Sequence, residues 1–115
     1  MKRTDSLKRK KEFRYTYRVG HSVPGSFTVL VYARSRSRVT RVGFSVSKKL
    51  GNAVVRNRIK RRLREAVTPL LPGIRGGYNL IFIAHASLKD APFASIGAQM
   101  LGQLRKAGLL AERVS

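Results

Sequence analysis

Residues 40–67, TRVGFSVSKKLGNAVVRNRIKRRLREAV, decide the fold. They join a segment in which apolar and polar residues alternate to a basic segment with helical spacing. In residues 40–47, apolar residues alternate with polar or small ones, which is the period of a β-strand with one packed face. Residues 53–67 carry apolar side chains at helical spacing, and Asn52 after Gly51 can cap the first turn. The sequence therefore predicts a strand that leads into a helix.

The predicted 53–67 helix separates an aliphatic arc from two basic flanks, at about 100° per residue. The arc, which is expected to pack on the sheet, consists of Val55, Ile59, Leu63 and Ala66. The basic flanks are Arg56, Lys60 and Arg64 on one side and Arg58, Arg61 and Arg62 on the other, with Glu65 as a local partner. A solvated basic face is the alternative, but such faces usually interleave acids with bases. This helix is therefore the first candidate for binding a polyanion.

Upstream, the pattern predicts a helix and two strands. Residues 7–19 are expected to be helical, with Asp5 or Ser6 as the cap and Gly20 as the stop. A short strand at 20–22 and a turn precede the strand 26–33, which alternates between two faces. One face holds Phe27, Val29 and Val31, and the other holds Thr28, Leu30 and Tyr32. Residues 34–38, RSRSR, are predicted to form an exposed basic turn.

Downstream, residues 78–84 are nearly all apolar, which predicts an interior strand. A last helix is expected to begin around Pro92 and to end near Gly108. Its predicted core stripe is Phe93, Ile96, Met100 and Leu104. The element order is then α-β-β-β-α-β-α, an α+β fold in one domain over residues 1–115. We expect an α/β sandwich, one sheet with its helices on one face.

Composition points to a nucleic-acid partner. The chain has 25 Lys and Arg against 5 Asp and Glu, a formal charge of +20, and a compact domain with that excess repels itself. An anionic membrane is the rival, but the apolar run at 80–84 is far too short to span a bilayer. Residues 1–6 are charged rather than apolar, which argues against a secretory signal, and we expect a cytoplasmic protein. The absence of Cys excludes thiolate zinc sites and thiol nucleophiles.

Two other classes of function stay open at this stage. An independent enzyme is disfavoured because no catalytic motif is present and the acids are scattered, at Asp5, Glu12, Glu65, Asp90 and Glu112. The histidines, at positions 21 and 85, have no obvious partner at ligand spacing. A ribosomal protein or a DNA-binding module would suit the charge and the size. A helix-turn-helix is disfavoured because a strand precedes the basic helix.

At this point the sequence resembles a known family. Residues 41–61, RVGFSVSKKLGNAVVRNRIKR, resemble the signature of the bacterial ribonuclease P protein subunit, and its centre is Arg56-Asn57-Arg58. Leu7, Glu12-Phe13, Tyr17 and Gly20 are similar to the family's first helix, so the resemblance covers nearly the whole chain. It implies an accessory protein, without catalytic residues of its own, in an endoribonuclease whose catalyst is RNA. That RNA removes the 5′ leader of precursor tRNA.

The resemblance also implies partners, a topology and a first binding surface. The protein is expected to bind the catalytic RNA as a monomer in the ribonucleoprotein, away from membranes, while Mg²⁺ serves the RNA and no cofactor belongs to the protein. A four-stranded mixed sheet with a left-handed β-α-β crossover is implied, against the usual right-handed rule. The expected contacts to the catalytic RNA are Lys48, Lys49, Asn52, Arg56, Asn57, Arg58, Lys60, Arg61, Arg62 and Arg64.

A second surface implied by the resemblance is a cleft for the precursor leader, between the first helix and the sheet. Its expected residues are Phe13, Tyr17, Thr28, Leu30, Tyr32 and Ser45. The two rings of the first helix are one turn apart and share a face, so both could stack on unpaired bases at roughly 1–3 kcal/mol per base. The alternative is that both rings belong to the core. The family commonly has an aromatic residue where Leu30 aligns, and Tyr32 could replace that ring.

Overall fold

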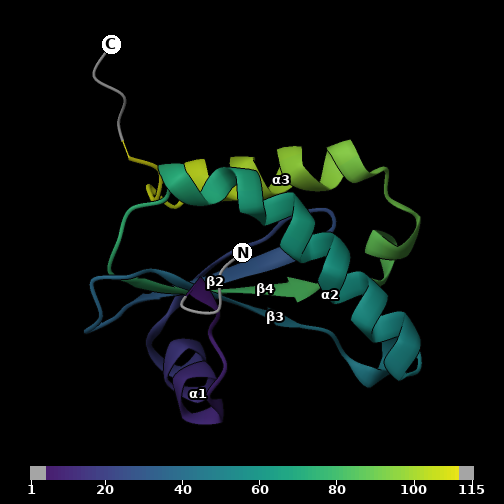
Figure 1. The fold of residues 1–115 in the computed structure, drawn as a ribbon, viewed down its shortest axis with the longest axis horizontal. Coiled ribbons are helices and arrows are strands. Elements are labelled where there is room, and N and C mark those ends of the chain that lie inside the picture. Colours follow the sequence, from purple (N-terminus) through teal and green to yellow (C-terminus); the bar gives the residue numbers. More distant parts are fainter. Residues whose placement is uncertain (1–4, 112–115) are drawn as a thin grey trace.

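The computed structural model describes residues 5–111, which form a four-stranded sheet with helices packed on it (Figure 1). The helices are α1 (Lys10–Val19), α2 (Ala53–Val67) and α3 (Phe93–Lys106), and the strands are β1 (His21–Val23), β2 (Thr28–Arg34), β3 (Arg41–Ser45) and β4 (Tyr78–Ala84). Short 3-10 helices are η2 (Lys48–Leu50), η3 (Thr68–Gly73) and η4 (Ala86–Asp90). The predicted order α-β-β-β-α-β-α is confirmed.

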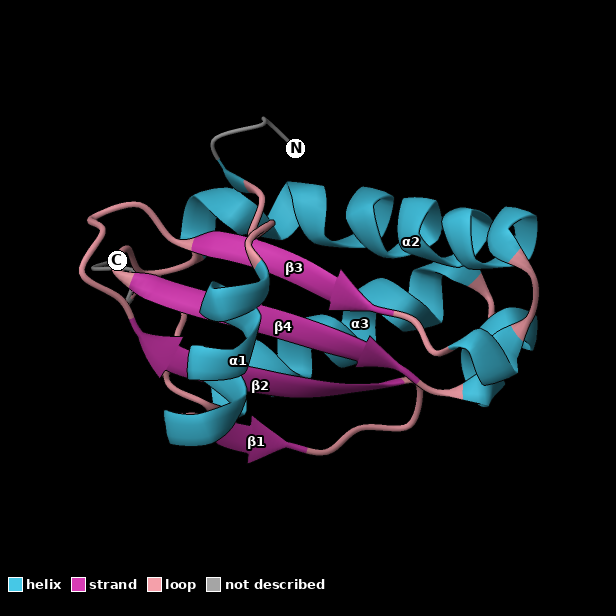
Figure 2. Ribbon diagram, turned by 90° about the horizontal axis from the view of Figure 1, so that it is seen from below, coloured by secondary structure: helices cyan, strands magenta, loops and turns pink. Residues whose placement is uncertain are grey.

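The sheet is mixed, and its strands lie in the order β1-β2-β4-β3. The pairs β1–β2 and β2–β4 are antiparallel, whereas β3 and β4 are parallel and are joined through α2. In Figure 2, β3 and β4 point the same way with β4 below β3, and α2 runs above β3 on the side of the sheet opposite α1, as Figure 1 also shows. A connection that passes behind two such strands in this arrangement is left-handed, as the resemblance implied.

Helices cover both faces of the sheet, so the expectation of helices on one face is wrong. Figure 1 places α2 and α3 on one side of the strands and α1 on the other. The reason is that the central strands are apolar on both faces, and each face needs cover. Leu30 and Phe82 are fully buried on the side of α2 and α3, the α2/α3 face. Val31 and Ile81 are buried on the other side, the α1 face, with Leu7.

The main core lies under α2 and α3 and includes a buried polar network. Gln99 Oε1 accepts hydrogen bonds from the backbone N–H groups of Phe27 (2.8 Å) and Thr28 (2.9 Å). Gln103 Nε2 donates to the carbonyls of Val23 (2.9 Å) and Thr28 (2.8 Å). These bonds fasten the β1–β2 connection to α3 and satisfy polar groups that would be costly to bury unpaired.

Helix boundaries follow the predictions unevenly. The predicted range of α2 is confirmed, and Asn52 caps it, with its side-chain oxygen accepting from Val55 N at 3.0 Å. The first helix begins later than predicted, and neither proposed cap residue caps it, because Leu7 N donates to Val42 O at 3.0 Å and continues the sheet edge instead. Phe93 is 47% exposed rather than core. No helix within residues 5–111 is long and apolar enough to cross a membrane, and Glu112 lies outside the described residues.

Candidate nucleic-acid interface

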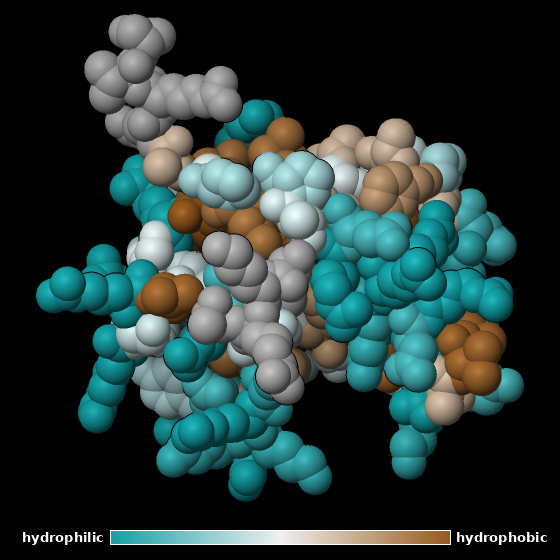
Figure 3. Space-filling view, viewed as in Figure 1, coloured by the Kyte–Doolittle hydropathy of each residue, from teal (hydrophilic) through white to brown (hydrophobic). Residues whose placement is uncertain are grey.

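Helix α2 packs through its aliphatic side and turns its cations outward. Ile59, Leu63 and Ala66 are buried against the sheet, as predicted, and Val67 joins them. Val55 is half-buried at the edge of this contact. In Figure 3, hydrophilic side chains gather over α2. The basic helix therefore offers a charged surface on a rigid element.

The predicted contacts to RNA differ in exposure. Those that are exposed are Lys48, Lys49, Asn52, Asn57, Arg58, Arg61 and Arg64, and those that are half-buried are Arg56, Lys60 and Arg62. The side-chain oxygen of Asn52 is used by the helix cap. Arg61 Nε lies 3.3 Å from Glu65 Oε1 in an exposed ion pair, which is worth little and can exchange for a phosphate contact.

Arg62 has a structural role that the sequence did not reveal. Its Nη1 donates to Leu88 O at 3.0 Å and to Lys89 O at 3.4 Å, and its Nη2 donates to Ala91 O at 2.6 Å. Three backbone carbonyls in or next to η4 thus accept hydrogen bonds from this guanidinium. These bonds hold α2 to the segment that precedes α3, and the RNA contact assigned to Arg62 stays a prediction.

The other flank of α2 borders a hollow at the edge of β3. Lys60 and Arg64 line it from α2, and Phe13 lines it from α1. The hollow has a volume of about 280 Å³, and its remaining lining residues are Ser6, Leu7, Lys8, Val42, Gly43 and Phe44. Arg56 shares this flank of the helix by its spacing, and its Nε is buried without an acceptor among the described residues. The cationic helix and the first aromatic residue of the predicted cleft therefore meet across the sheet edge.

The α1 face of the sheet carries only part of the predicted leader cleft. The rings of Phe13 and Tyr17 lie with their centroids 6.3 Å apart, and Tyr17 is 43% exposed. Phe13 is half-buried and packs on the small apolar cluster of Leu7 and Ile81, so it is partly core. Ser45 also lies on this face, beside Ile83 in the parallel register. These three predicted residues share the expected side of the sheet.

Three residues that were predicted to line the cleft lie on the opposite face of the sheet, so their assignment is corrected. Thr28 and Leu30 are fully buried on the α2/α3 face, where Thr28 joins the network with the glutamines of α3. Tyr32 lies on that same face by register, opposite Leu80, and its ring packs 5.7 Å from that of His21. None of the three can line a cleft under α1. The prediction assigned the more polar face of residues 26–33 to the α1 side, whereas the structure places that face under α2 and α3.

The residues that take their place are apolar. Val29 and Ile83 are directly opposite each other in β2 and β4 and are half-buried on the α1 face. In Figure 2, α1 crosses one half of the strands and leaves the half toward the ends of β3 and β4 uncovered. The signal that could have found them is the apolar run in β4, which requires an apolar surface on both faces.

No group of three or more His, Cys, Asp or Glu within residues 5–111 is arranged to hold a metal ion. Two of the acids are close to cations: Glu12 Oε2 lies 3.6 Å from Arg41 Nη1, and Glu65 pairs with Arg61.

Comparisons with known proteins agree on one family. A family model described as Ribonuclease P matches residues 1–108. The chain is 42% identical over 111 residues to the ribonuclease P protein component of Symbiobacterium thermophilum, covering 96% of each. It is 38% identical over 106 residues to that of Clostridium botulinum, covering 91% of this chain and 96% of the relative.

Solved structures give the same fold. The structure of the Staphylococcus aureus RNase P protein matches with a TM-score of 0.82 at 33% identity, covering 93% of this chain and 98% of that one. The RNase P protein from Thermotoga maritima matches with a TM-score of 0.79 over 88% of this chain and 96% of that one, and at 23% identity it bears on the fold alone.

Proposed function

Because this chain belongs to the ribonuclease P protein family, which acts in the maturation of tRNA 5′ ends, we propose that it is the accessory subunit of an enzyme whose catalyst is RNA. In this proposal the protein binds the catalytic RNA through α2 and the 5′ leader of precursor tRNA through the α1 face of the sheet. The observation that carries it is the outward cationic side of α2, anchored by a buried aliphatic side.

The contact with the catalytic RNA is built for phosphate. Arg58 and Arg64 are exposed on the outer side of α2, and Lys48 and Lys49 extend the charge from η2 just before the helix. A guanidinium can donate two parallel hydrogen bonds to a phosphate, and a helix held by its core side loses little freedom on binding. Folded RNA supplies phosphates at many spacings, so a rigid cationic face of this kind supports binding to a structured RNA.

The contact with the leader is built for unpaired bases. Tyr17 presents an exposed ring beside Phe13, and Val29 and Ile83 form an apolar floor on the same face. Base stacking on aromatic rings tolerates any sequence, as a factor that serves many precursors requires. The hollow lined by Phe13, Lys60 and Arg64 brings a ring of α1 beside cations of α2, which supports a leader that lies close to the catalytic RNA.

We further propose that the RNA, not the protein, holds the Mg²⁺ ions that the cleavage needs. The described acids are few, and two of them already face arginines, so the protein's contribution is to position RNA strands by charge and stacking. A protein that places substrate correctly can raise affinity and rate without supplying a reacting group.

Reconstitution tests the proposal. The purified protein, the catalytic RNA and their mixture are each given precursor tRNA at low Mg²⁺, with a series of leaders of increasing length. We expect cleavage by the RNA-containing samples only, with the protein lowering KM for precursors whose leaders reach the α1 face. Cleavage by protein freed of RNA, or a benefit of the protein that does not change when the leader is removed, would contradict the accessory role.

A further inference from the structure

A second arginine cluster lies at the end of the sheet opposite the start of α2. The loop between β2 and β3 and the turn before β4 meet there, and in Figure 1 both lie at the left while α2 begins at the right. The cluster, which we name the loop arginines, consists of Arg34, Arg36, Arg38 and Arg75, and all four are exposed. They line one hollow of about 520 Å³ together with Gly76, Gly77 and Tyr78.

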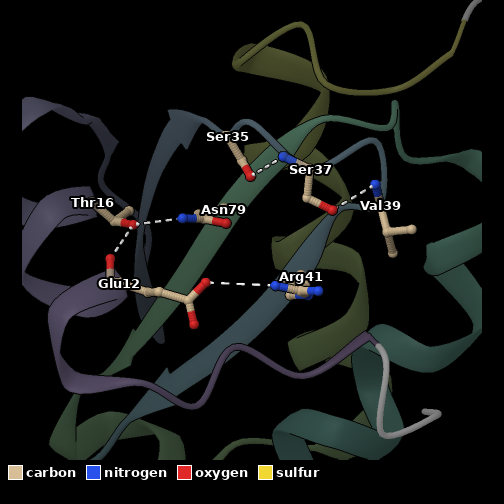
Figure 4. Close-up of polar contacts among 7 residues, drawn as sticks. All are labelled: Glu12, Thr16, Ser35, Ser37, Val39, Arg41 and Asn79. Carbon is tan, nitrogen blue, oxygen red and sulfur yellow. Dashed lines mark hydrogen bonds and ion pairs between the residues drawn. The ribbon is translucent and has the colours of Figure 1, made fainter.

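The loop that carries these arginines is organised by its serines. Ser35 Oγ accepts from Ser37 N at 3.0 Å, and Ser37 Oγ accepts from Val39 N at 3.1 Å (Figure 4). Each serine thus forms a turn with the backbone two residues ahead. The serines are half-buried while the arginines between them are exposed, so the alternation RSRSR places every guanidinium on the outside.

The loop is also fastened at both ends to the turn before β4. Ser35 N donates to Gly77 O at 2.8 Å, the hydroxyl of Thr40 donates to Arg75 O, and Tyr78 N donates to the same hydroxyl at 3.2 Å. At its base, Arg34 stacks over the Tyr78 ring with 5.8 Å between its guanidinium carbon and the ring centroid. A loop fixed in this way presents its charges without a large cost in conformational entropy on binding.

Acidic neighbours do not neutralise the cluster. The sequence has no Asp or Glu between Glu12 and Glu65. Among the described residues that line the hollows at this end of the sheet, the acid is Glu12, and Arg41 lies 3.6 Å from it. Like charges held close together destabilise a folded chain unless a polyanion covers them. The loop arginines are thus an uncompensated cationic site that the contacts of α2 do not use.

We propose that the loop arginines form a second binding surface for an RNA phosphodiester backbone, separate from α2. This inference rests on the proposed function, because it assumes that the chain works within a ribonucleoprotein. The loop arginines would bind a series of consecutive phosphates, which either the catalytic RNA or the precursor tRNA can supply. One surface on α2 and a second on the β2–β3 loop and the turn before β4 would let one small protein hold two separate RNA segments in a fixed relation.

Tethered cleavage tests the proposal, since the chain has no Cys and a single one can be introduced. Val39→Cys places an iron chelate on the loop and Val54→Cys places one on α2, at valines that are 46% and 66% exposed. Ala98→Cys on the exposed side of α3 is the control. Each labelled protein is assembled with the catalytic RNA and precursor tRNA, and hydroxyl-radical cuts are mapped on each RNA by end-labelling.

We expect the chelate at position 39 to cut one RNA at sites different from those cut from position 54, with background cleavage from position 98. Cuts in the catalytic RNA assign the surface to assembly, and cuts in the precursor assign it to substrate. If position 54 cuts and position 39 gives only background, the second surface is wrong while the proposed function stands. If neither position cuts, both are overturned.

A charge-matched pair of triple variants supplies an independent readout. The loop variant carries Arg36→Gln, Arg38→Gln and Arg75→Gln. The α3 control variant carries Arg105→Gln and Lys106→Gln in α3 and Lys89→Gln in η4 just before it; all six positions are exposed. Both lose three charges. The loop variant should bind one of the two RNAs on the order of tenfold more weakly at fixed salt, and the control less than about twofold. Equal losses in both variants would mean that net charge alone acts.

Discussion

Replacing two arginines of α2 that lie four residues apart is expected to have different effects: one replacement should lower stability, and the other should lower RNA affinity. Arg62→Ala removes a guanidinium that donates to Leu88 O at 3.0 Å and to Ala91 O at 2.6 Å, with a weaker contact to Lys89 O. Hydrogen bonds from a charged donor contribute about 1.5–3 kcal/mol each, and water can rehydrate part of this half-buried site. We therefore expect a total loss of about 2–3 kcal/mol in the free energy of unfolding.

Arg58 is the matched comparison because it lies on the same helix and is exposed. Arg58→Ala should change the free energy of unfolding by less than about 0.5 kcal/mol, as is usual for an exposed site. If Arg58 binds one phosphate, its loss should weaken binding to the catalytic RNA and lower the slope of log K against log salt by about 0.9. The two variants separate the structural and the RNA-binding roles of one basic helix.

Thermal unfolding of the free protein and filter binding to the catalytic RNA measure both effects. At about 4 °C per kcal/mol for a chain of this length, Arg62→Ala should melt about 8–12 °C lower than the parent protein. Below its melting temperature it should bind RNA with a salt slope close to that of the parent. An Arg62→Ala protein that melts normally but loses RNA affinity as Arg58→Ala does would refute the reasoning, because Arg62 would then be an RNA contact.

Three further replacements test the two faces of the sheet. Tyr17→Ala should weaken binding of precursor tRNA by the assembled complex but spare mature tRNA, because the proposed function stacks its exposed ring on leader bases; equal losses for both would point to misfolding. Gly43→Ala places a Cβ 2.5 Å from Phe13 Cζ, so it should cost about 1–3 kcal/mol in urea unfolding, and an unchanged midpoint would show that the ring moves freely. Gln103→Leu leaves the carbonyls of Val23 and Thr28 without their donor and should cost about 2–4 kcal/mol, whereas a neutral result would mean that water replaces it.

The parts of the fold that depend on local chemistry could be predicted from the sequence. The bounds of α2 follow from its apolar spacing and from the Asn52 cap, and both are properties of neighbouring residues. The apolar run of β4 and the alternation of β3 are similarly local. The basic helix was therefore recognisable, and its aliphatic side packs as the wheel predicted.

The errors arise where remote residues decide the outcome. Thr28 looked like a surface residue, but Gln99 and Gln103 of α3 provide it with buried partners more than seventy positions away. Leu7 was expected in the first helix, but it pairs with β3 instead. Arg62 looked like its basic neighbours, and only the folding of residues 88–91 against α2 distinguishes it. Local periodicity carries no information on such contacts.

The salt dependence of RNA binding tests most directly whether the outward side of α2 holds the catalytic RNA. A triple variant with Lys49→Gln, Arg58→Gln and Arg64→Gln, all at exposed positions, is compared with the α3 control variant of equal charge. If each removed side chain neutralises one phosphate, the slope of log K against log salt should fall by about 2.7 for the α2 variant and stay near the parent value for the control. Equal slopes for the two variants would contradict the account, because RNA would then respond to the overall charge of the protein and not to this face of the helix.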